Sequence, residues 1–255
     1  MKAVILAGGT PSTINNEREG IPKPMVEIGG RPMLWHIMKH FSLYGINEFI
    51  ICGGYRVDLI KEYFTDFYIY ESDITVDLEK NIIQIHKKVT EPWKVTVVDT
   101  GLDTMTGKRV SLIEKYIDED TFIVTYGDCL SDIDVSQLLE THKRGHKCGT
   151  VTIAKPKGRN QILPIDENGS ISYGKVMEDQ NSDAWVNADC FVFSRDIFNY
   201  LQKDEDLEKQ LLVSLAEDDQ ITTYCHKGYW RSIETRRDLV AAEKLWNTKS
   251  APWIK

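Results

Sequence analysis

Short apolar segments rich in β-branched residues alternate with amphipathic helical segments between Lys2 and Ala154, and this alternation constrains the fold more than any other feature. Strands that alternate with helices pair mostly in parallel, and the connecting helices cover both faces of the sheet. The sequence therefore predicts an α/β fold with a mostly parallel sheet. The expected strands are Lys2–Ala7, Glu48–Cys52, Lys94–Asp99, Thr121–Thr125 and Gly149–Ala154, and the expected helices are Pro32–Tyr44, Asp58–Phe64, Val110–Tyr116 and Val135–Arg144.

The second half of the chain is less regular. Its expected strands are Ile171–Met177, Trp185–Phe193 and Thr222–Cys225, and its expected helices are Asp196–Leu201, Leu207–Glu217 and Thr235–Trp246. Tyr68–Val76 and Ile82–Lys88 alternate in polarity like the strands of an antiparallel hairpin. We expect one domain over residues 1–255, with a β-hairpin insertion at about residues 68–94 that leaves the main sheet.

Composition excludes several classes of protein. The chain of 255 residues is 42% hydrophobic and 27% charged, as is usual for a globular protein, and it contains no apolar run of about 18 residues that could cross a bilayer. Five cysteines without a CxxC pair favour reduced thiols in the cytoplasm over a zinc site. A net charge of -8 argues against nucleic-acid binding, but a local cluster of Lys and Arg could still bind an anionic small molecule.

A glycine pair follows the first expected strand, in Leu6-Ala7-Gly8-Gly9, and a lysine beside a proline follows at Lys23. Glycines let backbone N–H groups approach a base, ribose or phosphate closely, and a lysine adds a compact positive charge for a phosphate. The alternative is a tight turn and an ordinary surface lysine. The loop between them matches neither G-x-G-x-x-G nor the P-loop pattern.

A second cluster, Tyr126-Gly127-Asp128, ends the buried apolar run that begins at Thr121. A carboxylate there is well placed to hold Mg²⁺ against a triphosphate, and Glu234 could supply a partner carboxylate. The alternatives are an aspartate in a strand-end turn and an acidic residue just ahead of a helix N-terminus.

Four segments in this order resemble the sugar-nucleotide pyrophosphorylases, a family of nucleotidyltransferases: LAGG, the KPMVEIGG-x-P-x-LWHIMK run, YGD and a late GYW. The segments Glu91–Thr96, Val98–Gly101 and Thr104–Gly107, with Ala251–Trp253, resemble the glucose-1-phosphate cytidylyltransferases within it. The resemblance implies a Rossmann-like core and a Mg²⁺-dependent reaction. In that reaction the acceptor phosphate attacks the α-phosphate of CTP in line and pyrophosphate leaves.

The resemblance also implies roles for single residues. Lys23, Asp128 and Glu234 would be catalytic, with the two carboxylates as the metal ligands. The nucleotide would contact Leu6, Ala7, Gly8, Gly9, Lys23, Thr104, Gly127 and Arg109. Oligomers are common in the family, and the Tyr68–Lys94 hairpin with the Asp99–Arg109 loop is a plausible contact region. Lys108 and Arg109 could then serve a nucleotide of a neighbouring subunit; the alternative is a solvated basic pair.

The chain departs from the family inside the implied active site. Thr13 stands where relatives carry an arginine for the triphosphate, although Arg18 could reach the same phosphates. The family's E-K-P becomes Glu178-Asp179-Gln180, its N-G-G becomes Asn187-Ala188-Asp189, and its late metal-binding aspartate becomes Glu234. The family's G-R-F-G becomes a segment that contains Arg159. The implied acceptor-binding residues are thus Glu178, Asp179, Asn187, Asp189 and Arg159.

Asp179 thus replaces the lysine that binds the sugar phosphate in relatives, and this replacement changes the local charge by two units. Each unit charge about 4 Å from a phosphate is worth about 4 kcal/mol at an effective dielectric constant near 20. A sugar phosphate should bind poorly unless Lys175 or Arg159 compensates, whereas Asp179 and Asp189 would suit an acceptor with an amino group. A shift of the alignment by one or two residues is the simpler alternative.

Three functions remain. The first is a cytidylyltransferase for a phosphorylated small molecule, with an altered acceptor pocket. The second is a cytidylyltransferase for an amino-acid phosphate such as phosphoglutamine, which would serve modification of a capsule or surface polysaccharide. The third is a nucleotide-binding regulatory protein that has lost catalysis, which Thr13 favours and the retained Lys23, Asp128 and Glu234 oppose.

Overall fold

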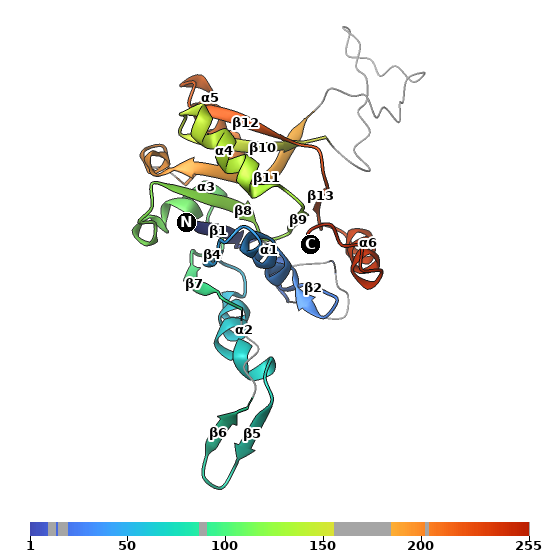
Figure 1. Ribbon diagram of the computed structural model, residues 1–255. Coiled ribbons are helices and arrows are strands. Elements are labelled where there is room, and N and C mark those ends of the chain that lie inside the picture. Colours follow the sequence, from blue (N-terminus) through green and yellow to red (C-terminus); the bar gives the residue numbers. More distant parts are fainter. Residues whose placement is uncertain (10–13, 15–19, 87–90, 156–184, 202–203, 255) are drawn as a thin grey trace.

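A central sheet of seven strands organises the molecule (Figure 1). The structure is a computed structural model that describes residues 1–9, 14, 20–86, 91–155, 185–201 and 204–254. The strand order is β12-β10-β11-β8-β1-β4-β7. These strands are β1 (Lys2–Ala7), β4 (Glu48–Gly53), β7 (Lys94–Asp99), β8 (Thr121–Tyr126), β10 (Gly149–Ala154), β11 (Val186–Ser194) and β12 (Ile221–His226).

Six of the seven strands run in the same direction. β1 pairs in parallel with β4 and β8, β4 with β7, and β10 with β12. Only β11 is reversed, because it pairs antiparallel with both β8 and β10. The prediction of a mostly parallel sheet is confirmed, and one edge of the sheet collects the carboxyl ends of six strands. Ligands bind along this edge in open α/β sheets.

Helices cover both faces of the sheet, as predicted (Figure 1). One face packs under α1 (Met33–Ser42), α4 (Val135–Gly145) and α6 (Arg236–Asn247), and the other under α3 (Thr106–Ser111) and α5 (Leu212–Glu217) with the π-helical turn η5 (Leu207–Leu211). The alternation of side chains along β1 shows the two-sided burial: Ala3, Ile5 and Ala7 join the first core, whereas Val4 and Leu6 join the second.

Local sequence explains where several helices begin and end. α1 buries Met33, Leu34, Ile37, Met38 and Phe41, whose spacing forms one helical face. The N-cap of α4 is Asp134, whose side chain accepts a hydrogen bond from the N–H of Gln137. The N-cap of α6 is Thr235, which forms a capping box with Asp238.

The region after β4 differs from its prediction. α2 (Val57–Tyr70) is longer than the expected helix Asp58–Phe64, so the hairpin begins later, with β5 (Ile74–Asp77) and β6 (Ile82–Ile85). The expectation of a strand from Tyr68 is wrong: the helix continues to Tyr70, and within it Tyr63 and Phe67, one helical turn apart, pack edge to face with ring centroids 5.6 Å apart. The hairpin projects from the body beside α2 and forms a separate two-stranded sheet (Figure 1).

The helix expected at Val110–Tyr116 also differs. α3 begins earlier, at Thr106, and ends at Ser111, and a separate 3-10 turn η2 covers Glu114–Tyr116. Contacts with residues much later in the chain fix the start of α3. Thr106 Oγ1 accepts a hydrogen bond from the N–H of Leu207, and the N–H of Gly107 donates to the carbonyl of Glu205. A short-range pattern carries no sign of these contacts.

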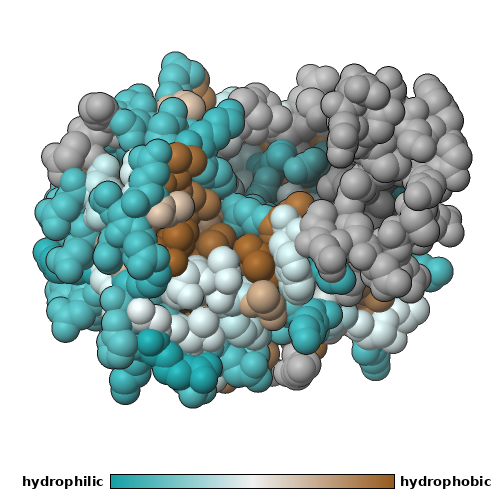
Figure 2. Space-filling model, turned by 90° about the horizontal axis from the view of Figure 1, so that it is seen from above, coloured by the Kyte–Doolittle hydropathy of each residue, from teal (hydrophilic) through white to brown (hydrophobic). Residues whose placement is uncertain are grey.

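The remaining elements are short. They are the 3-10 turns η1 (Lys23–Met25) and η4 (Arg195–Asn199), the paired strands β2 (Glu27–Ile28) and β3 (Arg31–Pro32), and the paired strands β9 (Cys129–Ser131) and β13 (Trp230–Ser232). Among the described residues, no helix is both long and apolar enough to span a membrane. Seen from above, hydrophobic side chains gather in the middle of a largely hydrophilic surface (Figure 2).

Candidate active site

A cavity of about 660 Å³ lies at the carboxyl ends of β1, β7 and β8. Its lining includes eight residues that the sequence singles out although they come from four separate parts of the chain: Leu6, Ala7, Gly8, Gly9, Lys23, Thr104, Arg109 and Asp128. We call it the nucleotide cavity. Gly127 follows Tyr126 at its wall, with its N–H donating to the carbonyl of Leu6.

Lys23 and Asp128 form an ion pair inside this cavity, with Lys23 Nζ 3.2 Å from Asp128 Oδ2. Lys23 is held by the turn η1, and Asp128 follows the last buried residues of β8. Their side chains remain 29% and 23% exposed, so both groups can still be reached by a ligand. The pair thus places a cation and an anion side by side in the cavity, an arrangement that suits a metal-bound phosphate chain.

Glu234 lies close to Asp128 through its backbone. β13 pairs antiparallel with β9, so that Ser232 is opposite Cys129, and the N–H of Ile233 donates to the carbonyl of Asp128 at 2.8 Å. Glu234 is exposed, and its carboxylate accepts from Ser232 Oγ at 3.5 Å. Mg²⁺ usually takes one or two protein carboxylates together with substrate phosphates, and these two residues fit that donor set.

Arg109 is buried, with only 4% of its surface exposed. Its Nη2 donates to the carbonyls of Gly8 and Leu102, and its Nη1 donates to the carbonyls of Gly53 and Gly101 and to Thr100 Oγ1. The interpretation as a solvated basic pair is therefore wrong for Arg109. Contact with a nucleotide of a neighbouring subunit would require the guanidinium to leave these acceptors.

The close approach of Arg109 explains the glycine at position 8. A Cβ atom on Gly8 would lie 2.1 Å from Arg109 Nη1, so any side chain at position 8 would displace the guanidinium from its hydrogen-bond acceptors. The guanidinium therefore joins the loops after β1, β4 and β7 in one network, and this network shapes the wall of the nucleotide cavity.

Other lining residues were not predicted. Tyr55, Leu102, Asp103, Met105, Thr106 and Asp206 also line the nucleotide cavity. Tyr55 follows a glycine pair after β4, so the rule that ligands bind at the ends of parallel strands could have found it. Asp206 comes from beyond β11, and no local signal links it to the site. Tyr126 lines the cavity as well, and its hydroxyl donates to Glu208.

Asp189 and Asn187 lie on β11, beside β8. The N–H of Asp189 donates to Asn187 Oδ1 at 3.0 Å, and its carbonyl accepts from Thr125 Oγ1. Asp189 has a φ of 57°, a left-handed conformation that favours glycine. Burial, together with the charges of Asp128 and Glu208, raises the pKa of the Asp189 carboxyl to about 7.

Several positions from the sequence analysis lie outside the described residues: Thr13, Arg18, Arg159, Lys175, Glu178, Asp179 and Gln180, together with the expected strand Ile171–Met177. Their part in the site is not described by the structure.

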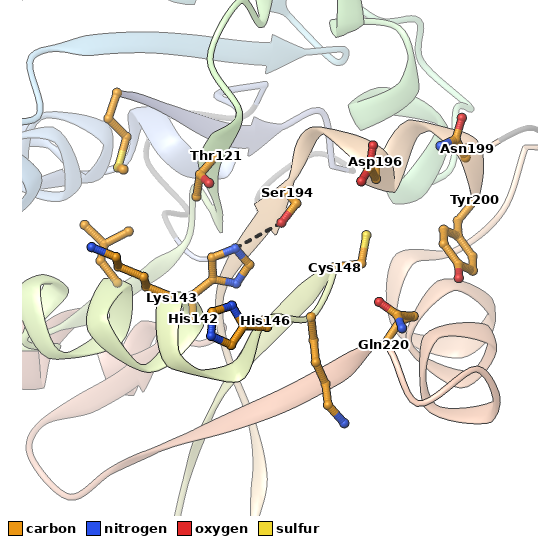
Figure 3. Close-up of a pocket in the computed structure, with 13 residues that line it drawn as sticks. Thr121, His142, Lys143, His146, Cys148, Ser194, Asp196, Asn199, Tyr200 and Gln220 are labelled. Atoms are coloured by element: carbon orange, nitrogen blue, oxygen red, sulfur yellow. Dashed lines mark hydrogen bonds between the residues drawn. The ribbon is translucent and has the colours of Figure 1, made fainter.

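A separate cavity of about 790 Å³ lies near the amino ends of β8, β10 and β12, away from the carboxyl edge (Figure 3). Its buried His142 points toward Ser194, with Nε2 3.2 Å from the hydroxyl, and its Nδ1 lies 2.9 Å from Thr150 Oγ1. Burial lowers the pKa of His142. Both ring nitrogens are thus occupied, which is typical of a structural histidine.

Comparisons with known proteins agree with this fold. The family model described as nucleotidyl transferase matches residues 2–248. The chain is 40% identical to glucose-1-phosphate cytidylyltransferase of Salmonella typhi over 99% of this chain and 98% of that protein. It is 36% identical to the probable glucose-1-phosphate cytidylyltransferase of Bacillus subtilis over 99% of both chains.

Solved structures share the fold. HddC from Yersinia pseudotuberculosis matches with a TM-score of 0.68 at 22% identity, over 96% of this chain and 99% of that one. The inositol-1-phosphate CTP transferase from T. maritima matches with a TM-score of 0.65 at 15% identity, over 98% and 95%. The sequence-based resemblance is confirmed: this chain belongs to the nucleotidyl transferase family and is an enzyme of the nucleotidyltransferase type.

Proposed function

We propose that this enzyme is a Mg²⁺-dependent cytidylyltransferase that joins CTP to a phosphorylated small-molecule acceptor and releases pyrophosphate. The observation that carries the proposal is the Lys23–Asp128 pair beside the Gly8-Gly9 loop, in a chain 40% identical to a cytidylyltransferase. The preference for CTP rests on the relatives. We propose further that residues 1–255 act as one nucleotidyltransferase domain.

We propose roles for the residues that line the nucleotide cavity. The backbone of Leu6, Ala7, Gly8 and Gly9, with Thr104 and Gly127, would hold the nucleotide, and Lys23 would neutralise the triphosphate. Arg109 would act indirectly by fixing the carbonyl of Gly8, so that the loop keeps its shape before the nucleotide arrives.

Asp128 and Glu234 are the residues that would hold Mg²⁺. When bound, the ion would neutralise charge that develops on the phosphates during transfer. Lys23 balances the Asp128 carboxylate in the structure, and the same lysine would be available to the phosphates if Asp128 held Mg²⁺.

We propose that the acceptor site differs from that of a sugar-phosphate enzyme. Asp189 puts a half-buried carboxyl group at a left-handed backbone position, where the family pattern N-G-G would place a glycine. This observation favours, as a second candidate, an amino-acid phosphate such as phosphoglutamine, whose ammonium group Asp189 would face. Asn187, Glu178, Asp179 and Arg159 are the further acceptor-binding residues of the proposal. Such an enzyme would serve the modification of a capsule or surface polysaccharide.

A regulatory protein without catalysis is the less favoured alternative, because Lys23 and Asp128 keep the geometry of a working pair. We also propose a cytoplasmic homo-oligomer. Its support is the projecting hairpin β5–β6, on which Ile74, Val76, Leu78, Ile82 and Ile83 are exposed apolar side chains. Such a surface on an isolated arm is typical of a contact between subunits.

The metal site is tested by Asp128→Asn, which keeps the shape of the side chain but removes an anionic oxygen ligand. We expect turnover to fall by a factor of about 10² or more, while the melting temperature stays within a few degrees. Pyrophosphate release at a range of Mg²⁺ concentrations measures the effect. Glu234→Asp is the matched control, because it restores the residue of the relatives and should keep turnover. Near-native turnover of Asp128→Asn with Mg²⁺ would show that Asp128 is not a ligand.

A further inference from the structure

A cavity of about 410 Å³ opens at the carboxyl ends of β10 and β12. Its side chains include two tryptophans, Trp185 and Trp230, and two lysines, Lys155 and Lys227. We call it the tryptophan–lysine cavity. Lys155 directly follows β10, Lys227 directly follows β12, and Trp185 directly precedes the reversed strand β11, so the topology of the sheet brings all three to the same edge.

The wall that carries Lys227 is rigid. Asp132 accepts a hydrogen bond from the N–H of Tyr229 at 2.6 Å, and the same carboxylate oxygen lies 3.2 Å from His226 Nε2. His226 Nε2 also lies 3.0 Å from the carbonyl of Tyr229. The turn fits closely against this carboxylate, since a Cβ on Gly228 would lie 2.2 Å from Asp132 Oδ1. The backbone position from which the Lys227 side chain extends is therefore fixed.

The tryptophan–lysine cavity lies on the same edge of the sheet as the nucleotide cavity. Trp230 lines the tryptophan–lysine cavity and begins β13, which pairs with β9 directly after Asp128. β10 is two strands away from β8. Neighbouring strands are about 4.8 Å apart, so Lys155 starts about 10 Å from the end of β8.

The charge of the cavity has one sign. Among its described lining residues none is an aspartate or a glutamate, and the charged groups at its rim are the ammonium groups of Lys155 and Lys227. Lys155 Nζ lies 5.8 Å from the centre of the Trp185 ring, over the indole. Ammonium groups only donate hydrogen bonds, so they match a ligand group that only accepts them. A carboxylate is such a group, whereas a sugar hydroxyl needs an acceptor as well.

We propose that the tryptophan–lysine cavity binds a carboxylate at the end of the acceptor that is remote from its phosphate, with Lys155 and Lys227 as the specificity-determining residues. The indoles of Trp185 and Trp230 flank the carbon chain between the two anionic ends. This inference rests on the proposed function, and it narrows the acceptor to phosphorylated carboxylic acids, among them phosphorylated amino acids. It also explains how the chain gains affinity for its acceptor without the lysine that relatives use.

The test compares a phosphorylated amino acid with its α-carboxamide, using glucose 1-phosphate as a third acceptor. Pyrophosphate release is measured at saturating CTP and Mg²⁺ for the wild type, Lys155→Met, Lys227→Met and Trp185→Ala. We expect the wild type to prefer the carboxylate over the carboxamide by about tenfold in kcat/KM, and each lysine variant to raise the KM for the carboxylate about fivefold. The KM for CTP and the KM for the carboxamide should not change.

Lys143→Met is the matched control, because it removes one exposed lysine at the opposite edge of the same sheet. It should behave as the wild type with every acceptor. The inference is overturned if the wild type treats carboxylate and carboxamide alike, or if the lysine variants change no KM. It is also overturned if Trp185→Ala raises the KM for glucose 1-phosphate while the lysine variants have no effect, since the cavity would then hold a sugar ring.

A wrong proposed function gives a different result from a wrong inference about the tryptophan–lysine cavity. If no acceptor supports pyrophosphate release, the enzyme is not a cytidylyltransferase for these compounds. Calorimetric titration of the phosphorylated amino acid and its carboxamide then decides the inference by itself. Binding that requires the carboxylate and weakens in both lysine variants supports it, and equal or undetectable binding of the two compounds overturns it.

Discussion

The backbone conformation of Asp189 and the acids around its carboxyl group are both unfavourable for an aspartate, and this points to a functional role. Its φ of 57° is sterically unfavourable for any residue with a Cβ, and its carboxyl group is buried near two other acids, Asp128 and Glu208. The family pattern N-G-G at this place made the change visible in the sequence. The backbone conformation, which explains why glycine is common there, could be found only in the structure.

The raised pKa of Asp189 makes stability depend on pH. The folded-state pKa of about 7 lies above the usual value of 3.8, so the carboxyl group lowers the free energy of unfolding progressively as pH rises from about 4 to 7. Asp189→Asn removes this effect. The free energy of unfolding of the variant, relative to that of the wild type, should be about 2–3 kcal/mol higher at pH 8 than at pH 5. Urea unfolding without divalent cations measures the difference.

Asp189→Gly is the companion variant, because it removes the charge and also relieves the left-handed backbone. It should be at least as stable as Asp189→Asn at both pH values. A wild-type protein whose stability relative to Asp189→Asn is the same at pH 5 and pH 8 would show that Asp189 is ionised in the folded state and has an ordinary pKa.

Lys23 and Asp128 could be found from the sequence because each lies in a short segment whose residue types reflect its chemistry. The sequence identified Arg109 as a candidate residue but could not predict its hydrogen-bond network, because its five acceptors lie at the carboxyl ends of three different strands. Glu234 was an acidic residue ahead of a helix, and only the pairing of β13 with β9 brings it to Asp128. Contacts between distant segments are what a local pattern lacks.

At the scale of elements, Arg109 on α3 connects the carboxyl ends of β1, β4 and β7. Arg109→Lys keeps the charge but cannot reach several carbonyls with a planar fork, so buried acceptors lose their donors. We expect the free energy of unfolding to fall by about 3 kcal/mol and the KM for CTP to rise about tenfold. The KM for the acceptor should not change.

Denaturant unfolding and initial-rate kinetics measure these two effects of Arg109→Lys. Lys108→Met is the control, since it removes the neighbouring charge on the same helix without touching the network around Gly8. If Arg109→Lys keeps both the stability and the KM for CTP of the wild type, the guanidinium does not organise the nucleotide loops.

The element boundaries show where sequence patterns were sufficient. β1, β7 and β10 begin and end where the apolar runs predicted. β1 and β10 are runs of mostly buried residues, and β7 is a run rich in β-branched residues that is partly exposed at the edge of the sheet. α2 and α3 differ from prediction because aromatic contacts extend the first and contacts with residues 205 and 207 set the start of the second. The ends of helices depend on tertiary contacts more than their middles do.

In the molecule as a whole, one edge of the sheet carries both the proposed nucleotide site and the proposed carboxylate site of the acceptor. The nucleotide cavity occupies the ends of β1, β7 and β8, and the tryptophan–lysine cavity occupies the ends of β10 and β12. The reversed strand β11 lies between them and carries Asn187 and Asp189. The alternating sequence predicted this arrangement of the parallel strands, but it gave no sign that β11 separates them.

Pyrophosphate release with CTP, UTP, dTTP, ATP and GTP in parallel tests whether the enzyme is a CTP-dependent transferase. Each nucleotide is supplied with Mg²⁺ and, in separate reactions, with glucose 1-phosphate or a phosphorylated amino acid. We expect release that depends on an acceptor and that is faster with CTP than with any other nucleotide, by about tenfold or more in kcat/KM. Release that is equally fast with another nucleotide, or no release with any acceptor, would contradict it.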